Sequence, residues 1–219
     1  MEGTEVSVER VRPVGENTVA VDLSNTEGWE ILPGQFVQVG APVGDDFVVR
    51  HYTVSSPYPD GSFEITVSVD PEGELGPVLA ELEAGDHVSA DGPYGRAYYE
   101  DEESVVVVAG GPGVGPAVGI AERVADQHGA ENVDVVYRDG EPAHENRLDA
   151  LRSEGARIRV IEDGLGDAVA EVLGEAPGSQ VFVYGFEPFI EEASEALEGS
   201  GYGTDGAKIE NFGPEPGSG

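Results

Sequence analysis

The feature that most restricts the fold of this chain is a run of four valines that leads directly into a glycine-rich turn. Residues 104–109 read SVVVVA, and residues 109–116 read AGGPGVGP. A continuous apolar run of this length is typical of a parallel strand that is buried on both faces. Glycines between such a strand and a helix let the backbone approach a phosphate, and the helix N-terminus offers unpaired N–H groups. The pattern predicts a nucleotide-binding strand–turn–helix unit, and the alternative is a tight turn without a ligand.

The apolar periodicity changes near residue 100. Before it, short alternating segments bounded by turn residues predict strands. These segments are 6–11, 18–23, 36–39, 51–54, 63–69 and 86–90, with one short helix expected at 75–82. Asp60-Gly61, between two of the segments, predicts a hairpin. Six strands and one small helix favour an antiparallel six-stranded β-barrel over residues 1–100.

After residue 100, strands and helices alternate. Strands are expected at 104–109, 133–137, 157–161, 180–184 and 207–210, and helices at 114–128, 143–154, 166–174 and 187–198. This rhythm predicts a doubly wound α/β domain with a parallel sheet over residues 101–219. No apolar stretch approaches the length of a membrane span, and the N-terminus lacks the features of a signal peptide. We therefore expect a cytoplasmic protein without membrane insertion. We also expect a monomer.

The charge balance is extreme, with 44 acidic residues, 11 basic residues and a formal net charge of −33. Self-repulsion of this size opposes compaction in dilute buffer, whereas salt shortens the screening length to about 3 Å at 1 M. The acidic residues lie along the whole chain, which indicates an acidic protein of haloarchaeal type that works in high salt. An acidic face for a basic partner is the alternative. Nucleic-acid binding is disfavoured, because phosphate contacts need clustered lysine and arginine.

The chain contains no cysteine, which excludes disulfides, thiolate catalysis and ordinary iron–sulfur ligation within it. Its four histidines are too widely spaced for a metal site, so no metal is predicted.

In the first half, residues 50–53 read RHYT. On a strand, Arg50 and Tyr52 share one face, with the Thr53 hydroxyl nearby. The planar fork of arginine suits a pyrophosphate, and tyrosine offers a flat ring with a polar tip. An anionic aromatic ligand is one interpretation, and a surface arginine beside a packed tyrosine is the other.

Five motifs occur in a defined order along the chain. They are Arg50-x-Tyr52-Thr53, Gly92-Pro93-Tyr94-Gly95, Gly110-Gly111-x-Gly113-x-x-Pro116, Val183-Tyr184-Gly185 and Lys208-Ile209-Glu210-Asn211-Phe212-Gly213. In this order they resemble the ferredoxin–NADP reductase superfamily over nearly the whole chain. The resemblance implies a flavin-binding barrel, a nicotinamide-binding domain, and FAD and NAD(P)H as cofactors.

The resemblance also implies roles for individual residues. Arg50 would contact the flavin pyrophosphate, Tyr52 would lie against the isoalloxazine, and Thr53 would hydrogen-bond near its N5. Thr53 and Tyr184 are the candidate catalytic residues. The further candidates for cofactor binding are Gly73, Leu75, Gly76, Gly92, Pro93, Gly110, Gly111, Gly113, Val114, Gly115, Pro116, Arg138, Gly185 and Phe212. Two positions depart from the family pattern: Gly76 replaces the usual serine or threonine, and Tyr184 the usual cysteine.

By this resemblance the chain would be an FAD-dependent oxidoreductase that moves electrons from NAD(P)H to ferredoxin, flavodoxin or free flavin. An accessory electron-transfer subunit of a larger redox complex and a non-catalytic nucleotide-binding module are the alternatives. The preference between NAD and NADP stays open, because Arg138 favours a 2′-phosphate and the adjacent Asp139 favours a free ribose.

Overall fold

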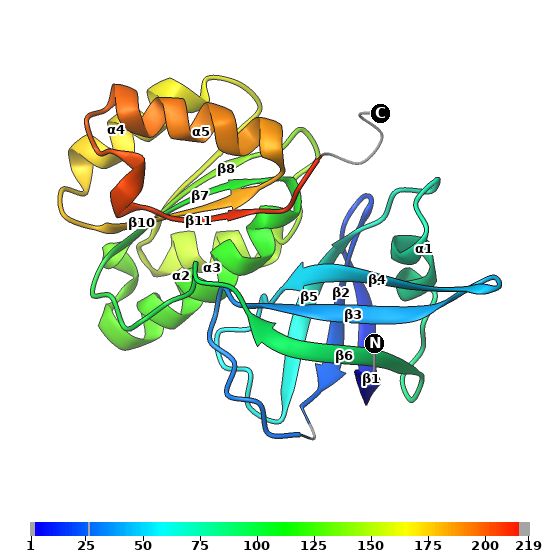
Figure 1. Cartoon of the computed structure of the whole chain (residues 1–219). Helices are drawn as coiled ribbons and strands as arrows, with labels where there is room; N and C mark the ends of the chain where they lie inside the picture. Colours follow the sequence, from blue (N-terminus) through cyan, green and yellow to red (C-terminus); the bar gives the residue numbers. More distant parts are fainter. Residues whose placement is uncertain (1–2, 26, 215–219) are drawn as a thin grey trace.

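The computed structural model describes residues 3–25 and 27–214, which form two domains joined near residue 100 (Figure 1). The first is an antiparallel sheet of six strands in the order β4-β3-β6-β1-β2-β5. The strands are β1 (Thr4–Gly15), β2 (Thr18–Ser24), β3 (Phe36–Val43), β4 (Asp46–Thr53), β5 (Ser62–Ser68) and β6 (His87–Tyr94), with the helix α1 (Leu75–Ala80) between β5 and β6. A bridge between Val54 and Ile65 brings the two edges together. The six-stranded barrel predicted from the alternating pattern is confirmed.

The connections at the barrel's closing edge differ from the sequence prediction. The segment expected at 51–54 is the end of a longer strand, β4, which pairs with β3 across a turn at Gly44-Asp45. The hairpin predicted at Asp60-Gly61 is wrong. β5 pairs along its length with β2, and it meets the chain after β4 through the isolated Val54–Ile65 bridge and the hydrogen bonds of Ser55 and Ser56 beside it. The local turn signal is real, since Gly61 has a φ of 76°, but it does not determine which strands pair.

The second domain is a parallel sheet in the order β11-β10-β7-β8-β9. Its strands are β7 (Val105–Gly110), β8 (Val133–Arg138), β9 (Arg157–Ile161), β10 (Gln180–Gly185) and β11 (Lys208–Asn211). Its helices are α2 (Val114–His128), α3 (Glu145–Glu154), α4 (Leu165–Glu175) and α5 (Glu187–Gly199), with short 3₁₀ turns at Gly111–Gly113, Ala130–Asn132 and Thr204–Gly206. This is the doubly wound sheet that the sequence predicts.

The valine run forms the central strand β7, in which every residue is buried. Val105 and Val107 pack in the core beneath α2 and α3, whereas Val106 and Val108 pack in the core beneath α4 and α5. Figure 1 shows the two pairs of helices on opposite faces of the sheet. Successive side chains of a strand point to opposite faces, so an uninterrupted apolar run suits a strand covered on both sides.

The order of the strands reverses next to β7, because α2 leads to β8 on one side while β10 lies on the other. Ligands bind outside the carboxyl ends of such strands, at the point where the order switches. Here the first turn of α2 lies against the barrel: a Cβ on Gly115 would come within 2.6 Å of the Thr66 hydroxyl. The barrel therefore covers part of this edge. Within residues 3–25 and 27–214, no helix has the length and apolar character that a membrane crossing demands.

Closure of the barrel generates a stability prediction. Ile65 is fully buried in the barrel core and forms the closing bridge. We expect Ile65→Ala to lower the free energy of unfolding by about 2–5 kcal/mol, and Ile65→Val by about 0.5–1.5 kcal/mol, because the cavity left in the core grows with each carbon removed. Chemical denaturation in high salt measures both values. Equal losses from the two variants would contradict a tightly packed closing edge.

Candidate functional site

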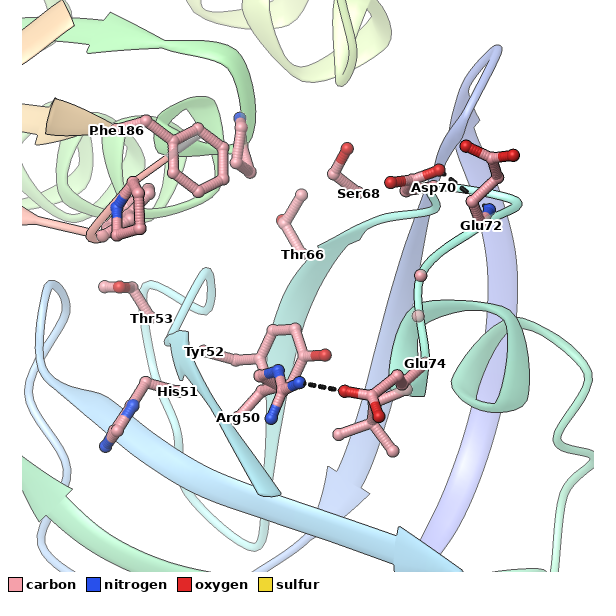
Figure 2. A pocket seen from close by; sticks show the side chains of 16 residues that line it. Arg50, His51, Tyr52, Thr53, Thr66, Ser68, Asp70, Glu72, Glu74 and Phe186 are labelled. Carbon is pink, nitrogen blue, oxygen red and sulfur yellow. Dashed lines mark hydrogen bonds and ion pairs between the residues drawn. The ribbon is translucent and has the colours of Figure 1, made fainter. Parts of the chain in front are cut away.

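A cavity of about 600 Å³ lies where the edges of the barrel meet and opens toward the second domain (Figure 2). The barrel contributes β4, β5 and the segment that leads into α1. The residues lining the cavity are Arg50, His51, Tyr52, Thr53, Thr66, Ser68, Asp70, Glu72, Gly73, Glu74, Leu75, Gly76, Pro112, Phe186, Phe212 and Pro214. β4 and β5 are the two end strands of the sheet. Because they are not paired along their length, the cavity lies between them.

The three residues of the predicted flavin motif all line this cavity. Arg50 is exposed, Tyr52 is half-buried and Thr53 is buried, so the strand runs from solvent into the interior. Burial raises the pKa of Tyr52 to about 12, which keeps the phenol neutral at any working pH. The site therefore offers a cation, a flat neutral ring and a hydroxyl in sequence along one strand.

Three acidic side chains line the same cavity as Arg50, and one of them contacts it. Arg50 forms an ion pair with Glu74 and donates a 2.9 Å hydrogen bond to the Val49 carbonyl. Asp70 and Glu72 lie on the same segment as Glu74, and the Asp70 carboxylate accepts a 2.9 Å hydrogen bond from the Glu72 N–H. Figure 2 shows all three carboxylates on the side of the cavity that faces α1.

The start of α1 and the segment before it place three of the predicted cofactor-binding residues at the cavity wall. Gly73 precedes the helix, Leu75 and Gly76 are its first two residues, and the Leu75 side chain also packs in the barrel core. A Cβ on Gly76 would lie 3.1 Å from the Ser68 carbonyl oxygen. A hydroxyl-bearing side chain at residue 76 would therefore need the Ser68 carbonyl to shift by a few tenths of an ångström.

The glycine-rich turn predicted to bind nucleotide has a packing role at several of its positions. A Cβ on Gly113 would collide with the Tyr184 carbonyl oxygen, and Gly115 packs on the barrel. Val114 and Pro116 of α2 are also buried. Gly111 has a φ of 54° and open space around its Cα, so its backbone stays accessible, whereas Gly110 is buried against Phe189. Pro112 is the residue of this turn that reaches the cavity.

Tyr184 lies differently from the expectation. The resemblance makes Tyr184 a candidate catalytic residue, but its side chain is fully buried and does not line the cavity. Its hydroxyl donates a hydrogen bond to the Ala97 carbonyl, and its ring stacks on Phe182 at 6.4 Å. Burial raises its pKa well above the ordinary value. The structure thus gives Tyr184 a packing role below the site.

Other predicted residues are distributed around the cavity. Phe212 lines it, and Gly185 ends β10 directly before Phe186. Gly92 and Pro93 lie in β6, outside the cavity. Arg138 ends β8 and forms an ion pair with Glu192. Its guanidinium carbon lies 4.9 Å from the centre of the Phe189 ring.

Sequence reasoning missed one clear member of the site, Phe186. Its ring lies 5.9 Å from that of Phe212 in an edge-to-face arrangement, and both line the cavity on the side of the second domain. The signal was available in the sequence, since an aromatic residue directly follows the predicted strand end at Gly185. Aromatic pairs of this kind present flat apolar surface to a planar ligand.

A polar network joins the two domains beside the cavity. Glu64 of β5 accepts a 2.8 Å hydrogen bond from Arg147 of α3, which also binds Glu122 of α2 at 2.6 and 2.7 Å. Next to it, the Thr66 hydroxyl lies 2.7 Å from the Ser55 hydroxyl and 2.8 Å from His144 Nε2. Because Thr66 also lines the cavity, the network connects the cavity wall to both helices.

Comparison with known proteins gives this arrangement a family. Residues 6–99, which span the barrel, match the family described as "Oxidoreductase FAD-binding domain". The chain is 29% identical over 160 residues to the toluate 1,2-dioxygenase electron transfer component of Pseudomonas putida, covering 71% of this chain and 47% of that protein. It is also 29% identical over 209 residues to a glycine betaine monooxygenase reductase subunit of Pseudomonas aeruginosa, covering 84% and 57%. The barrel of this chain therefore matches an FAD-binding oxidoreductase domain, and both of these relatives are described as reductase or electron transfer components.

The fold agrees with this family. A ferredoxin NADP⁺ reductase of Neisseria gonorrhoeae, with bound FAD and NADP, superposes with a TM-score of 0.79 at 19% identity, over 97% of this chain and 99% of that one. At this identity the likeness concerns the fold alone. The chain spans about half the length of the two curated relatives described above.

The network at the domain interface generates a pH prediction. Burial, reinforced by the nearby arginines, lowers the pKa of His144 to about 3. Below the ordinary pKa of about 6.5 the unfolded chain takes up a proton that the folded chain refuses, so His144 lowers stability progressively as the pH falls, by about 1.4 kcal/mol at pH 5.5. We expect His144→Asn, which tolerates the φ of 55° at this position, to lose less stability than the parent between pH 7 and 5.5. Thermal unfolding measures this.

The exposed His87 offers a matched control for that experiment. His87→Asn is expected to follow the parent's pH dependence, because no buried imidazole is removed. A parallel pH dependence of His144→Asn and the parent would show that His144 is not held neutral in the folded protein.

The position of Tyr184 generates a second prediction. Tyr184→Phe removes a hydroxyl and leaves the buried Ala97 carbonyl without its donor, so we expect a loss of about 1–3 kcal/mol in the free energy of unfolding. The rate of flavin reduction by NAD(P)H in stopped-flow experiments is expected to stay within about twofold of the parent's rate, because the Tyr184 side chain does not line the cavity. A twofold change corresponds to less than about 1 kcal/mol in the activation barrier. A reduction rate that falls by more than about tenfold with unchanged stability would restore Tyr184 as a catalytic residue.

Proposed function

We propose that this chain binds FAD in the cavity between its domains, oxidises NAD(P)H there, and passes the electrons to a redox partner. The observation that carries the proposal is the composition of the cavity. Arg50, Tyr52 and Thr53 line it from the barrel, and Phe186 and Phe212 line it from the second domain. A volume of about 600 Å³ lies within the range of sites for small molecules and cofactors.

The residues present fit a flavin in three respects. The neutral ring of Tyr52 supplies a flat wall for an aromatic ligand. The guanidinium of Arg50 supplies the cation that a pyrophosphate needs. Thr53 is buried at the inner end of the strand, where its hydroxyl can hydrogen-bond to the ring. When bound, FAD would accept a hydride and release electrons singly, and the protein would supply placement and electrostatics.

The second domain would hold the nicotinamide cofactor. The backbone of Gly111 is open, and the turn lies at the switch point outside the carboxyl ends of the strands. Phe186 and Phe212 lie between this turn and the barrel, so they would limit access of water and guide the nicotinamide toward the ring. The domain network at Glu64 and Arg147 would keep the two binding sites at a constant separation.

A reductase component of a larger redox system is the second candidate, favoured by the relatives. Two of them are an electron transfer component and a reductase subunit, and this chain spans about half of each. In that case the physiological acceptor would be an oxygenase or a ferredoxin rather than free flavin. Rates of NADH- and NADPH-dependent reduction of ferredoxin, cytochrome and free flavin, compared at equal protein concentration, separate the two candidates.

The proposal predicts a coloured protein with a specific dependence on Arg50. Protein purified in high salt and supplied with FAD is expected to show a flavin spectrum that NADH or NADPH bleaches and ferricyanide restores. We expect Arg50→Gln to weaken FAD binding by at least about tenfold, since charge-assisted hydrogen bonds contribute about 1.5–3 kcal/mol. Equilibrium titration measures it, with Arg152→Gln, an exposed residue of α3 outside the cavity, as the control. A folded protein that takes up no FAD would contradict the proposed function and favour a non-catalytic nucleotide-binding module.

A further inference from the structure

The cation that the proposed pyrophosphate requires already has a partner within the protein. Arg50 of β4 and Glu74 of the segment before α1 form an ion pair, and both side chains line the cavity (Figure 2). Nη2 of the guanidinium contacts Glu74 and Nη1 donates to the Val49 carbonyl, so two of its three nitrogens already have partners. A pyrophosphate that approaches Arg50 would therefore compete with Glu74 for the guanidinium.

The charges of the cavity wall also oppose the binding of an anionic ligand. Among the residues of 3–25 and 27–214 that line the cavity, Arg50 is the only lysine or arginine, whereas Asp70, Glu72 and Glu74 contribute three carboxylates. The Asp70 carboxylate is partly occupied by the Glu72 N–H. A pyrophosphate that approaches Arg50 thus meets a wall with an excess of negative charge.

We propose that Glu74 is an internal competitor for the flavin pyrophosphate, so that salt controls the loading of this site. The proposal rests on the proposed function, because it concerns the same cavity. Salt would weaken the Arg50–Glu74 pair and would screen the repulsion between the carboxylates and the incoming phosphates. Flavin affinity would consequently rise with salt, which is the opposite of an ordinary arginine–phosphate contact, since salt screens the attraction between opposite charges.

Exposure of the pair makes it sensitive to salt. The side chains of Arg50 and Glu74 are 53% and 60% exposed, so dissolved ions reach both charges. Pairs of this kind contribute little on their own and are readily screened. By contrast, the Arg147–Glu64 pair at the domain interface is 18% and 8% exposed. Salt would therefore act on the cavity entrance while the contact between the domains persists.

The test compares flavins that differ in phosphate. FAD and riboflavin are titrated into the full-length protein, with flavin fluorescence as the readout, at KCl concentrations between about 0.3 and 3 M, over which the screening length falls from about 6 to 2 Å. We expect FAD affinity to rise about fivefold over this range. A change of this size matches the contribution of one exposed ion pair to binding. Riboflavin carries no phosphate and reports the general effect of salt on an aromatic ligand, so its affinity is expected to change less. Circular dichroism at each concentration restricts the comparison to folded protein.

Charge-removing variants separate competition from general repulsion. Glu74→Gln frees Arg50, so we expect it to bind FAD about fivefold more tightly than the parent at the lowest salt and to show a flatter salt dependence. Glu72→Gln removes one charge but leaves the pair, and a smaller gain is expected. Asp149→Asn removes an equal charge from an exposed pair with Arg152 on α3, outside the cavity, and is expected to behave as the parent.

The outcomes distinguish this proposal from the proposed function. If FAD binds and is reduced by NAD(P)H, but its affinity falls with salt or Glu74→Gln binds no more tightly, the competition by Glu74 is overturned while the reductase function stands. If the gains of Glu72→Gln and Glu74→Gln are equal, repulsion alone operates and the competition is again overturned. If neither flavin binds to folded protein at any salt concentration, both proposals fall together.

Discussion

The geometry of the candidate site depends on the polar contact between Glu64 of the barrel and Arg147 of the second domain. This contact, together with Thr66 and His144, holds β5 against α2 and α3. The cavity has walls from both domains, so a rotation of one against the other would open it. Breaking a largely buried ion pair by removing one partner costs several kcal/mol, because the remaining charge stays buried. The interface thus helps to define the relative orientation of the two domains.

The scarcity of basic residues makes each of them informative. Eleven lysines and arginines stand among 44 acidic residues, and most are engaged with carboxylates in the structure. Some pairs are structural, such as Asp134 of β8, almost completely buried against Arg157 of β9. Arg50 differs, since its partner Glu74 is exposed and both line the cavity. Screening by salt therefore affects these pairs unequally, and exposed pairs respond before buried ones.

Most of the fold could be predicted from periodicity. The valine run, the glycine-rich turn and the change of pattern near residue 100 predict a barrel followed by a doubly wound sheet, and the structure confirms both. The hairpin at Asp60-Gly61 failed because turn residues report local backbone geometry, whereas the pairing of β5 with β2 is set by closure of the barrel. Likewise Phe186 was missed, because a strand period does not show which loop side chain faces a cavity.

The sequence by itself determined the order of elements, the extreme charge and the residue types of the flavin motif, since these follow from local patterns. Only the tertiary structure decided how the side chains are used. In the folded chain, Tyr184 is buried in the core, the ring of Phe186 packs against that of Phe212, and Glu74 forms an ion pair with Arg50. The physical reason is that contacts between residues far apart in the chain depend on how strands close and domains pack. No spacing along the sequence encodes those distances.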